Sequence, residues 1–258
     1  MIIKVNDVSF KYDSDVILEN ISFEIQDKEI ISIIGPNGAG KTTLLKCLYK
    51  SLKPKTGSIY LFNKNLNLYK QKEIAKKIGL VPQNSEHNYF FTVEEAVIMG
   101  RYPHHKKFSK ETKEDFEIAK RNMELTDIYK LKDKYITELS GGEFQRLIIA
   151  RALTQTPTIL LFDEPTLHLD LKHQFELLEL LKRLVDENNI TILMVLHDIN
   201  LAVRFSDKIL ILSNKKIIAY GEPEKILNVE IIRNVFGVEV EINKSKTGIL
   251  NIFPIKAV

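Results

Sequence analysis

Apolar and polar residues alternate at the beginning of the chain. Apolar side chains occupy every second position over 8–12 (VSFKY) and again over 21–25 (ISFEI). Because successive side chains of a strand point to opposite faces, this alternation predicts a half-buried antiparallel sheet. Residues 29–34 (EIISII) show almost no alternation, which is typical of a strand buried on both faces of a parallel sheet. Residues 52–62 return to another alternating strand.

The middle of the chain changes to helical spacing. Helix-forming residues fill 41–49, and from Thr92 to about Leu139 apolar residues recur three and four positions apart. A polar, basic stretch at 101–107 (RYPHHKK) predicts a loop within that region. We therefore expect an inserted helical subdomain here.

Strands and helices alternate in the second half. The pattern predicts, in order, a helix to about Leu153, a strand at 158–163, an amphipathic helix from Leu171 to about Asn188, a strand at 190–197, a further helix and a strand at 208–213. Such alternation predicts a doubly wound α/β core. The tail from Gly221 predicts a helix followed by a short strand.

Composition excludes several classes of protein. The 258 residues carry 37 Lys and Arg against 34 Asp and Glu, a formal net charge of +3, so nothing predicts a nucleic-acid partner. No apolar run approaches the roughly 18 to 20 residues that cross a bilayer, and the first residues lack a secretion signal. Cys47 is the single cysteine, which fits a reducing compartment. We expect a globular protein that stays in the cytoplasm.

A phosphate-binding pattern follows the first buried strand. Its members are Gly35, Pro36, Asn37, Gly38, Ala39, Gly40, Lys41 and Thr42, and Thr43 completes the predicted site. This is the P-loop pattern, in its required place between a buried strand and a helix. Its glycines let backbone N–H groups point at phosphate oxygens, while Lys41 reaches the β- and γ-phosphates and Thr42 ligates Mg²⁺. The alternative is a glycine-rich turn without a ligand.

Two carboxylates end the strand at 158–163. Asp163 stands where a Mg²⁺ ligand is expected at the carboxyl end of a buried strand, and Glu164 comes next, where it can polarise a water molecule. An acidic pair after a strand also occurs as a solvated turn. The P-loop in the same chain favours the catalytic interpretation.

A third motif, LSGGE, begins a predicted helix. Ser140 and Glu143 have the spacing of a capping box. Capping alone needs no glycine, whereas Gly141 and Gly142 leave the N–H groups of the first turn open to an anion. Taken alone, the motif fits a plain N-cap and a ligand site equally well.

The order of these motifs resembles the nucleotide-binding subunits of ABC transporters over essentially the whole chain. The P-loop is followed by Gln83 in LVPQN, by LSGGE, by the strand ILLFDE, by Leu169-Asp170 and by His197 after another strand. The resemblance implies a P-loop NTPase (RecA-like) core with an N-terminal antiparallel β subdomain and an inserted α-helical subdomain. The resemblance implies a single ABC ATPase domain over 1–258. In it, the core with its β subdomain would comprise about 1–85 and 154–220, and the helical subdomain with the signature helix would comprise 86–153. The tail would be 221–258.

The resemblance also implies roles for individual residues. Tyr12 would stack on adenine, and Gln83 would sense Mg²⁺ and water beside a transmembrane partner. Glu164 would be the general base, and His197 would contact the γ-phosphate of ATP. The metal contacts are then expected from Thr42, Gln83 and Asp163, and the catalytic contacts from Glu164, His197, Lys41 and Gln83. Simpler alternatives are packing for Tyr12, a turn for Gln83 and a polar cap for His197.

A second copy of the chain is implied as well. The residues 140–142 would act on ATP held by the other subunit of a head-to-tail dimer. Asp170 belongs to the implied nucleotide-binding set, which is compatible with its capping the next helix. Glu143 stands where many family members carry Gln, and Leu167 stands where a small polar residue usually precedes the Leu-Asp pair. The second departure is expected to weaken the cross-subunit contact.

Three segments resemble the branch of ATPases that power importers of iron-siderophores, haem and cobalamin. They are 90–105 (FFTVEEAVIMGRYPHH), 167–184 (LHLDLKHQFELLELLKRL) and 221–240 (GEPEKILNVEIIRNVFGVEV). This implies permease subunits and, indirectly, an external substrate-binding protein as partners, at the cytoplasmic face of the membrane. The alternatives are an importer for zinc or manganese, a soluble ABC ATPase without a membrane partner, and a binding module without activity.

Aromatic residues gather after Gln83. Tyr89, Phe90, Phe91 and Tyr102 surround a loop that is otherwise polar. Aromatic clusters on an insert are typical of interfaces, which predicts that this surface docks a helix of a transmembrane subunit. The alternative is that the rings pack the helical subdomain itself.

Overall fold

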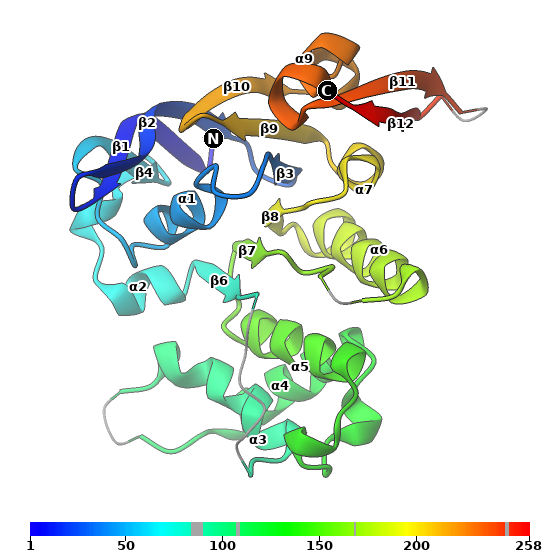
Figure 1. Cartoon of the computed structure of the whole chain (residues 1–258). Coiled ribbons are helices and arrows are strands. Elements are labelled where there is room, and N and C mark those ends of the chain that lie inside the picture. Colours follow the sequence, from blue (N-terminus) through cyan, green and yellow to red (C-terminus); the bar gives the residue numbers. More distant parts are fainter. Residues whose placement is uncertain (84–89, 107–108, 168, 246–247) are drawn as a thin grey trace.

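The computed structural model describes residues 1–83, 90–106, 109–167, 169–245 and 248–258. Within them the chain forms a four-stranded, a six-stranded and a two-stranded sheet. Figure 1 shows the helices α3 (Val93–Ile98), α4 (Lys113–Leu125) and α5 (Gly141–Thr154) gathered at the end of the molecule opposite the carboxyl-terminal tail. No helix of the described residues has the length and apolar character needed to cross a membrane.

The four-stranded sheet is antiparallel and lies at the amino-terminal side of the molecule. Its order is β2-β1-β4-β5, with β1 at Ile3–Tyr12, β2 at Asp15–Ile25, β4 at Thr56–Leu61 and β5 at Lys64–Asn65. Ile21, Phe23 and Ile25 are buried and the residues between them are exposed. The alternation in the sequence therefore predicted this half-buried sheet correctly.

The six-stranded sheet forms the centre of the molecule, in the order β10-β9-β3-β8-β7-β6. Its members are β3 (Ile30–Ile34), β6 (Ile78–Val81), β7 (Ile159–Asp163), β8 (Thr191–Val195), β9 (Lys208–Ser213) and β10 (Lys216–Gly221). Five of these strands run parallel, and β10 pairs antiparallel with β9 at the edge. The sequence pattern did not predict β6 or β10. The first is only four residues long, which is too short for a pattern to stand out, and every residue of the second is exposed or half-buried at the sheet edge.

Alternate residues of the central strands face two separate hydrophobic clusters. Ile30, Ile34 and Phe162 belong to one cluster and Ile31 and Ile33 to the other. Every residue of β3, β7 and β8 is buried, as the unbroken apolar runs predicted. The predicted P-loop NTPase core, with the antiparallel sheet on one side and a helical insert, is thus confirmed.

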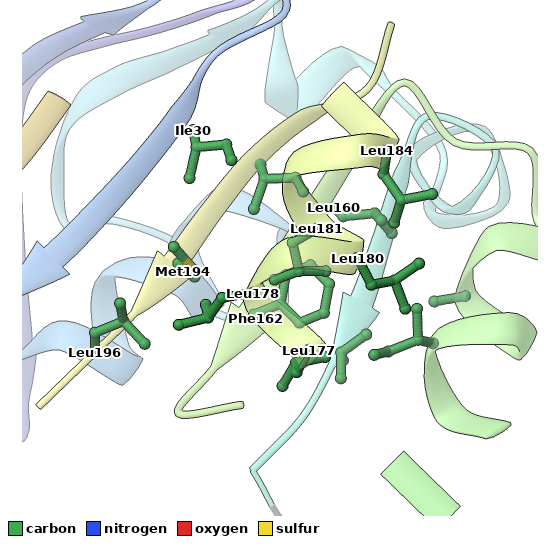
Figure 2. Packing of buried hydrophobic residues seen from close by; sticks show 14 of the residues in the cluster. Ile30, Leu160, Phe162, Leu177, Leu178, Leu180, Leu181, Leu184, Met194 and Leu196 are labelled. Carbon is green, nitrogen blue, oxygen red and sulfur yellow. The ribbon is translucent and has the colours of Figure 1, made fainter. Parts of the chain in front are cut away.

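Helices cover both faces of the central sheet. The core helices are α1 (Lys41–Leu48), α2 (Gln71–Ala75), α6 (Leu171–Asn188) and α7 (Ile199–Phe205), with a short 3₁₀ helix, η1, at Leu66–Leu68. The helix α6 lays its leucine stripe against the sheet, and Figure 2 shows Leu178 and Leu181 beside Phe162. Its predicted bounds are confirmed, because Asp170 caps the first turn and Asn189 ends the helix in a left-handed conformation.

The helical subdomain corrects one prediction. Besides α3, α4 and α5 it contains the 3₁₀ helices η2 (Met99–His104), η3 (Tyr129–Leu131) and η4 (Ile136–Glu138). The stretch 101–107 was predicted to be a polar loop, yet its first four residues are helical and Arg101 is only 8% exposed. Asp115 of α4 explains the difference, because its carboxylate accepts a hydrogen bond from Arg101 Nε at 2.8 Å.

The carboxyl-terminal tail confirms its prediction in part. The predicted helix is α9 (Val229–Phe236) and the predicted strand is β11 (Val238–Lys244), whereas α8 (Pro223–Ile226) and β12 (Leu250–Ala257), which forms a hairpin with β11, were not predicted. Pro254 lies inside β12, where proline is unfavourable, but the ladder shifts register between Glu239 and Val240. That irregularity accommodates the proline and explains why the pattern did not predict a strand here.

Candidate functional site

The glycine-rich loop turns sharply between β3 and α1. Gly35 has a φ of 152°, and a Cβ at this position would lie 1.9 Å from the backbone oxygen of Leu212 in the neighbouring strand β9. Gly40 has a φ of 98°, and a Cβ there would lie 2.9 Å from the backbone oxygen of Ile17. Only glycine fits both positions. The loop is therefore packed tightly against the strands β9 and β2.

In front of the loop is a cleft of about 350 Å³, which we call the nucleotide cleft. It is lined by Ile17, Asn37, Gly38, Ala39, Gly40, Lys41, Thr42, Thr43 and Glu164. The first turn of α1 contributes N–H groups without intrahelical partners, and these favour an anion. Ile17 of β2 was not predicted, because its alternating strand carries no sign of a nearby ligand.

Lys41 is folded onto the loop from which it extends. Its ammonium donates hydrogen bonds to the backbone oxygens of Gly35 at 2.8 Å and Pro36 at 3.0 Å. The residue is only 6% exposed, and this burial lowers the pKa of the ammonium, an effect that the carboxylates of Glu164 and Asp163 partly oppose. An ammonium has three N–H donors, so an anion in the cleft can replace these carbonyls or join them.

Thr42 and Asp163 meet at the inner end of the cleft. The Thr42 hydroxyl donates to Asp163 Oδ1 at 3.0 Å. Burial raises the pKa of Asp163, while the hydrogen bond from Thr42 opposes that rise. A hydroxyl and a carboxylate are the hard oxygen ligands that Mg²⁺ prefers beside phosphates. The donor set therefore fits the predicted magnesium site.

Glu164 lies between two predicted partners. Its Oε1 is 2.7 Å from Nε2 of His197, and its Oε2 accepts a hydrogen bond from Nε2 of Gln83 at 2.8 Å. These residues follow β8, β7 and β6, which are neighbours in the sheet, so their carboxyl ends meet at one edge. Both carboxylate oxygens are oriented, yet each retains a lone pair that can accept a proton from water.

The LSGGE motif lies apart from this cleft. Ser140 accepts a hydrogen bond from the Glu143 N–H at 3.4 Å, and Glu143 Oε2 accepts from the Ser140 N–H at 2.8 Å and from its hydroxyl at 2.7 Å. These contacts, the backbone N–H first, lower the pKa of Glu143. A Cβ at Gly141 would meet nothing within 4 Å. Among the described residues that line the nucleotide cleft, none belongs to 140–143. We call residues 140–143 the signature turn.

Tyr12 and Asp170 complete the predicted set. Tyr12 is 45% exposed at the end of β1 and contacts Phe10 edge to face, with ring centroids 4.8 Å apart. It is therefore not a core residue, and it is not among the described residues that line the nucleotide cleft. Asp170 caps α6 through the backbone N–H of His173 at 2.9 Å, so the capping alternative is present in the structure.

One predicted docking residue, Tyr102, lines a second depression, which we call the subdomain groove, whereas Phe90 and Phe91 are not among its lining residues. It measures about 580 Å³ and is lined by Ala75, Ile98, Met99, Gly100, Tyr102, Pro103, His105, Glu111, Arg151 and Gln155. Phe90 is 84% and Tyr102 78% exposed, and Phe91 is 39% exposed. The rings of Phe90 and Tyr102 thus do not fill the subdomain core, whereas Tyr89 lies outside the described residues.

Known proteins resemble this chain along most of its length. A family model described as ABC transporter matches residues 18–167. An ABC transporter ATP-binding protein of Methanocaldococcus jannaschii, itself described as uncharacterized, is 46% identical over 99% of this chain and 98% of that protein. The ferric enterobactin transport ATP-binding protein of Escherichia coli is 42% identical over 88% of this chain and 83% of that protein.

Solved structures agree with these relatives. An inward-facing conformation of a transporter assigned to the metal-chelate type of ABC transporter gives a TM-score of 0.87 at 28% identity, over 99% of this chain and 97% of that chain. The dimeric structure of a bacterial ABC transporter cassette gives 0.73 at 31% identity, over 86% of this chain and 98% of that chain. The resemblance therefore covers the cleft, the signature turn and the subdomain groove together.

Proposed function

The chain belongs to the ABC transporter family, as an ATPase that binds nucleotide, and from that premise we propose that it powers an importer of a ferric siderophore or a related metal chelate. The observation that carries the proposal is the hydrogen bond from Gln83 to Glu164. It joins the hydrolytic carboxylate to the segment that leads into the helical subdomain. ATP chemistry and movement of the subdomain are thereby connected through one side chain.

The residues of the cleft divide the work of hydrolysis. The N–H groups of the loop and the Lys41 ammonium hold the β- and γ-phosphates of ATP, and Tyr12 stacks on adenine. Thr42, Asp163 and Gln83 would hold Mg²⁺, which neutralises phosphate charge when bound. Glu164 takes a proton from water while the water oxygen bonds to the γ-phosphorus and the bond to the ADP oxygen breaks. His197 orients Glu164 and contacts the γ-phosphate.

Two copies are required for this reaction. The nucleotide cleft would hold one side of ATP, while the signature turn does not line it and offers a helix start with open space at Gly141. We expect the signature turn of a second subunit to close the cleft in a head-to-tail dimer. Hydrolysis per subunit should therefore rise steeply with protein concentration, which an ATPase titration followed by sizing would test. A rate that does not depend on concentration while monomer turns into dimer would contradict the dimeric site.

The subdomain groove is the proposed contact with a permease. Tyr102 is exposed in this groove, and Phe90 and Phe91 are exposed on the segment that leads into α3. These rings support docking of a helix from a transmembrane subunit, which would hold the ATPase at the cytoplasmic face of the membrane and act together with an external binding protein. Rigid-body movement of the subdomain on ATP closure would then move the docked helix. Reconstitution in vesicles with a candidate permease from the same genome, and comparison of the uptake of labelled ferric siderophore with that of zinc and manganese, tests the proposal. ATP hydrolysis without membrane co-purification would favour the soluble ATPase alternative.

A further inference from the structure

Two helix starts that serve different parts of the molecule touch each other. The helix α5 begins at the signature turn in the helical subdomain, and α6 begins at Asp170 in the core. A Cβ placed on Gly142 would lie 3.5 Å from Cδ2 of His173, so the imidazole lies directly against the signature turn. Leu169 and Gln145 close the same small depression.

The His173 ring is fixed on its other side. Its Nδ1 is 2.8 Å from Oδ1 of Asp170, and the same oxygen accepts the His173 backbone N–H at 2.9 Å. These two contacts hold the ring near one orientation, although 47% of the side chain is exposed. The imidazole is therefore a rigid spacer between the cap of α6 and Gly142.

One helical turn further, an ion pair joins the same two helices. Arg146 Nη2 lies 2.9 Å from Glu176 Oε2, and the side chains are 22% and 35% exposed. Arg146 Nη1 also donates to the backbone oxygen of Thr126, after α4, at 3.4 Å. Lys172 lies 3.7 Å from the second oxygen of Glu176. Arg146 thus connects the subdomain to α6 at a second point.

We propose that His173 and the Arg146–Glu176 pair position the signature turn from α6 and thereby set the rate of hydrolysis at the ATP site that this turn completes. The inference rests on the proposed head-to-tail dimer. Glu164 acts on the ATP of its own subunit, and only a short segment separates it from Asp170 and α6. The signature turn acts on the ATP of the partner. His173 and Arg146 therefore act on the partner's site through this turn, and both are positioning residues.

A charge exchange tests the ion pair. ATPase activity of the purified full chain is measured against protein and ATP concentration for Arg146→Glu, for Glu176→Arg and for the double variant. Each single variant should lower kcat and raise the protein concentration at half-maximal rate by roughly tenfold, equivalent to about 1.4 kcal/mol. The double variant should recover most of both losses. ATP binding by the monomer should stay constant, because the P-loop is untouched.

Two substitutions of His173 test the spacer. His173→Asn keeps a donor for Asp170 but removes the ring from Gly142, whereas His173→Phe keeps a ring but loses the donor. Both should lower kcat and the cooperativity in ATP, with the KM of the residual activity nearly unchanged. The matched control is Asp186→Asn, which removes a Lys182 pair of 3.4 Å within α6 alone and should behave as the unaltered protein.

The outcomes separate this inference from the proposed function. If the unaltered chain hydrolyses ATP independently of protein concentration, the dimeric site itself is wrong. If the unaltered chain shows the dependence but the single variants match it, the positioning role is wrong. Single losses without recovery in the double variant would also overturn the Arg146–Glu176 role, since the damage would then not come from the pair.

Discussion

The nucleotide cleft and the subdomain groove are built in opposite ways. The cleft draws seven of its nine lining residues from the single run 37–43. The groove takes its lining from α2, from 98–105, from Glu111 and from the end of α5. The predicted nucleotide site is thus encoded locally, whereas the proposed docking surface is assembled from distant segments. Changes in the cleft should therefore stop hydrolysis, and changes in the groove should separate hydrolysis from transport.

The largest effect is expected in the cleft. Glu164→Gln should slow ATP hydrolysis by roughly a hundredfold or more, because a positioned general base contributes about 10² to 10⁴. ATP binding should persist, and the ATP-bound dimer should accumulate. Steady-state ATPase assays and sizing with ATP measure both effects, with the exposed Glu187→Gln on α6 as the control. Unchanged turnover would remove Glu164 from the mechanism.

The second largest effect is expected at the proposed docking surface. Polar substitutions of Phe91 and Tyr102 should abolish uptake and co-purification with the permease while leaving basal ATPase activity largely intact. The matched control is Phe116→Ser, since Phe116 is 45% exposed on α4 and belongs neither to the segment 90–105 nor to the groove lining. If the complex survives both substitutions, or if basal ATPase activity collapses with them, the groove is not the docking surface.

A buried ion pair behind the groove should dominate the stability of the subdomain. Arg101→Met should lower the free energy of unfolding by about 3 to 5 kcal/mol, because Asp115, 5% exposed, would lose its guanidinium partner and keep only its contacts with Thr112 and His105. Lys4→Met breaks an exposed pair with Glu24 of 2.7 Å and should cost at most about 1 kcal/mol. Urea titrations of both variants compare the two costs. Equal losses would show that burial does not strengthen the Arg101 pair.

The Asp115 carboxylate should also make the free energy of unfolding depend on pH, with a smaller effect. Burial alone would raise the pKa of Asp115, but hydrogen bonds from Arg101, Thr112 and His105 hold it well below its usual range. The unfolded chain binds the proton more tightly, so this stabilisation is complete above the ordinary aspartate pKa and is lost as pH falls below it. For one titrating group, the free energy of unfolding cannot change by more than about 1.4 kcal/mol per pH unit. Urea titrations from about pH 7 to about pH 3.5 should show this loss in the free energy of unfolding. The Asp115→Asn variant should not show the part of the loss that comes from Asp115.

Sequence reasoning was most successful where the signal was local. The strands β3, β7 and β8 are continuous apolar runs, and α6 carries its own cap and leucine stripe, so their patterns sufficed. The residues 35–42, Asp163 and Glu164 were found because each motif directly follows such a strand. Parallel neighbours then bring the motif residues to one edge of the sheet.

Features that depend on distant partners were not predictable in this way. The sequence alone predicts a solvent-exposed charge at Arg101, whereas in the structure Asp115, fourteen positions later, lies beside it and accepts its hydrogen bond. His173 reads as a polar residue of α6, and only the packing of α5 brings Gly142 against its ring. The hairpin partner of β11 contains Pro254, which argues against a strand unless the register shift is known. In each case the missing information was a contact between segments far apart in the chain.

The close approach of Gly35 to β9 limits which second mutations can suppress a substitution at position 35. The obstacle to any side chain at this position is the backbone oxygen of Leu212, at 1.9 Å from the would-be Cβ. A backbone atom is present whatever amino acid the gene specifies at 212. No second mutation at that codon can therefore remove the obstacle, and a revertant screen starting from Gly35→Ala should recover glycine codons rather than changes at position 212.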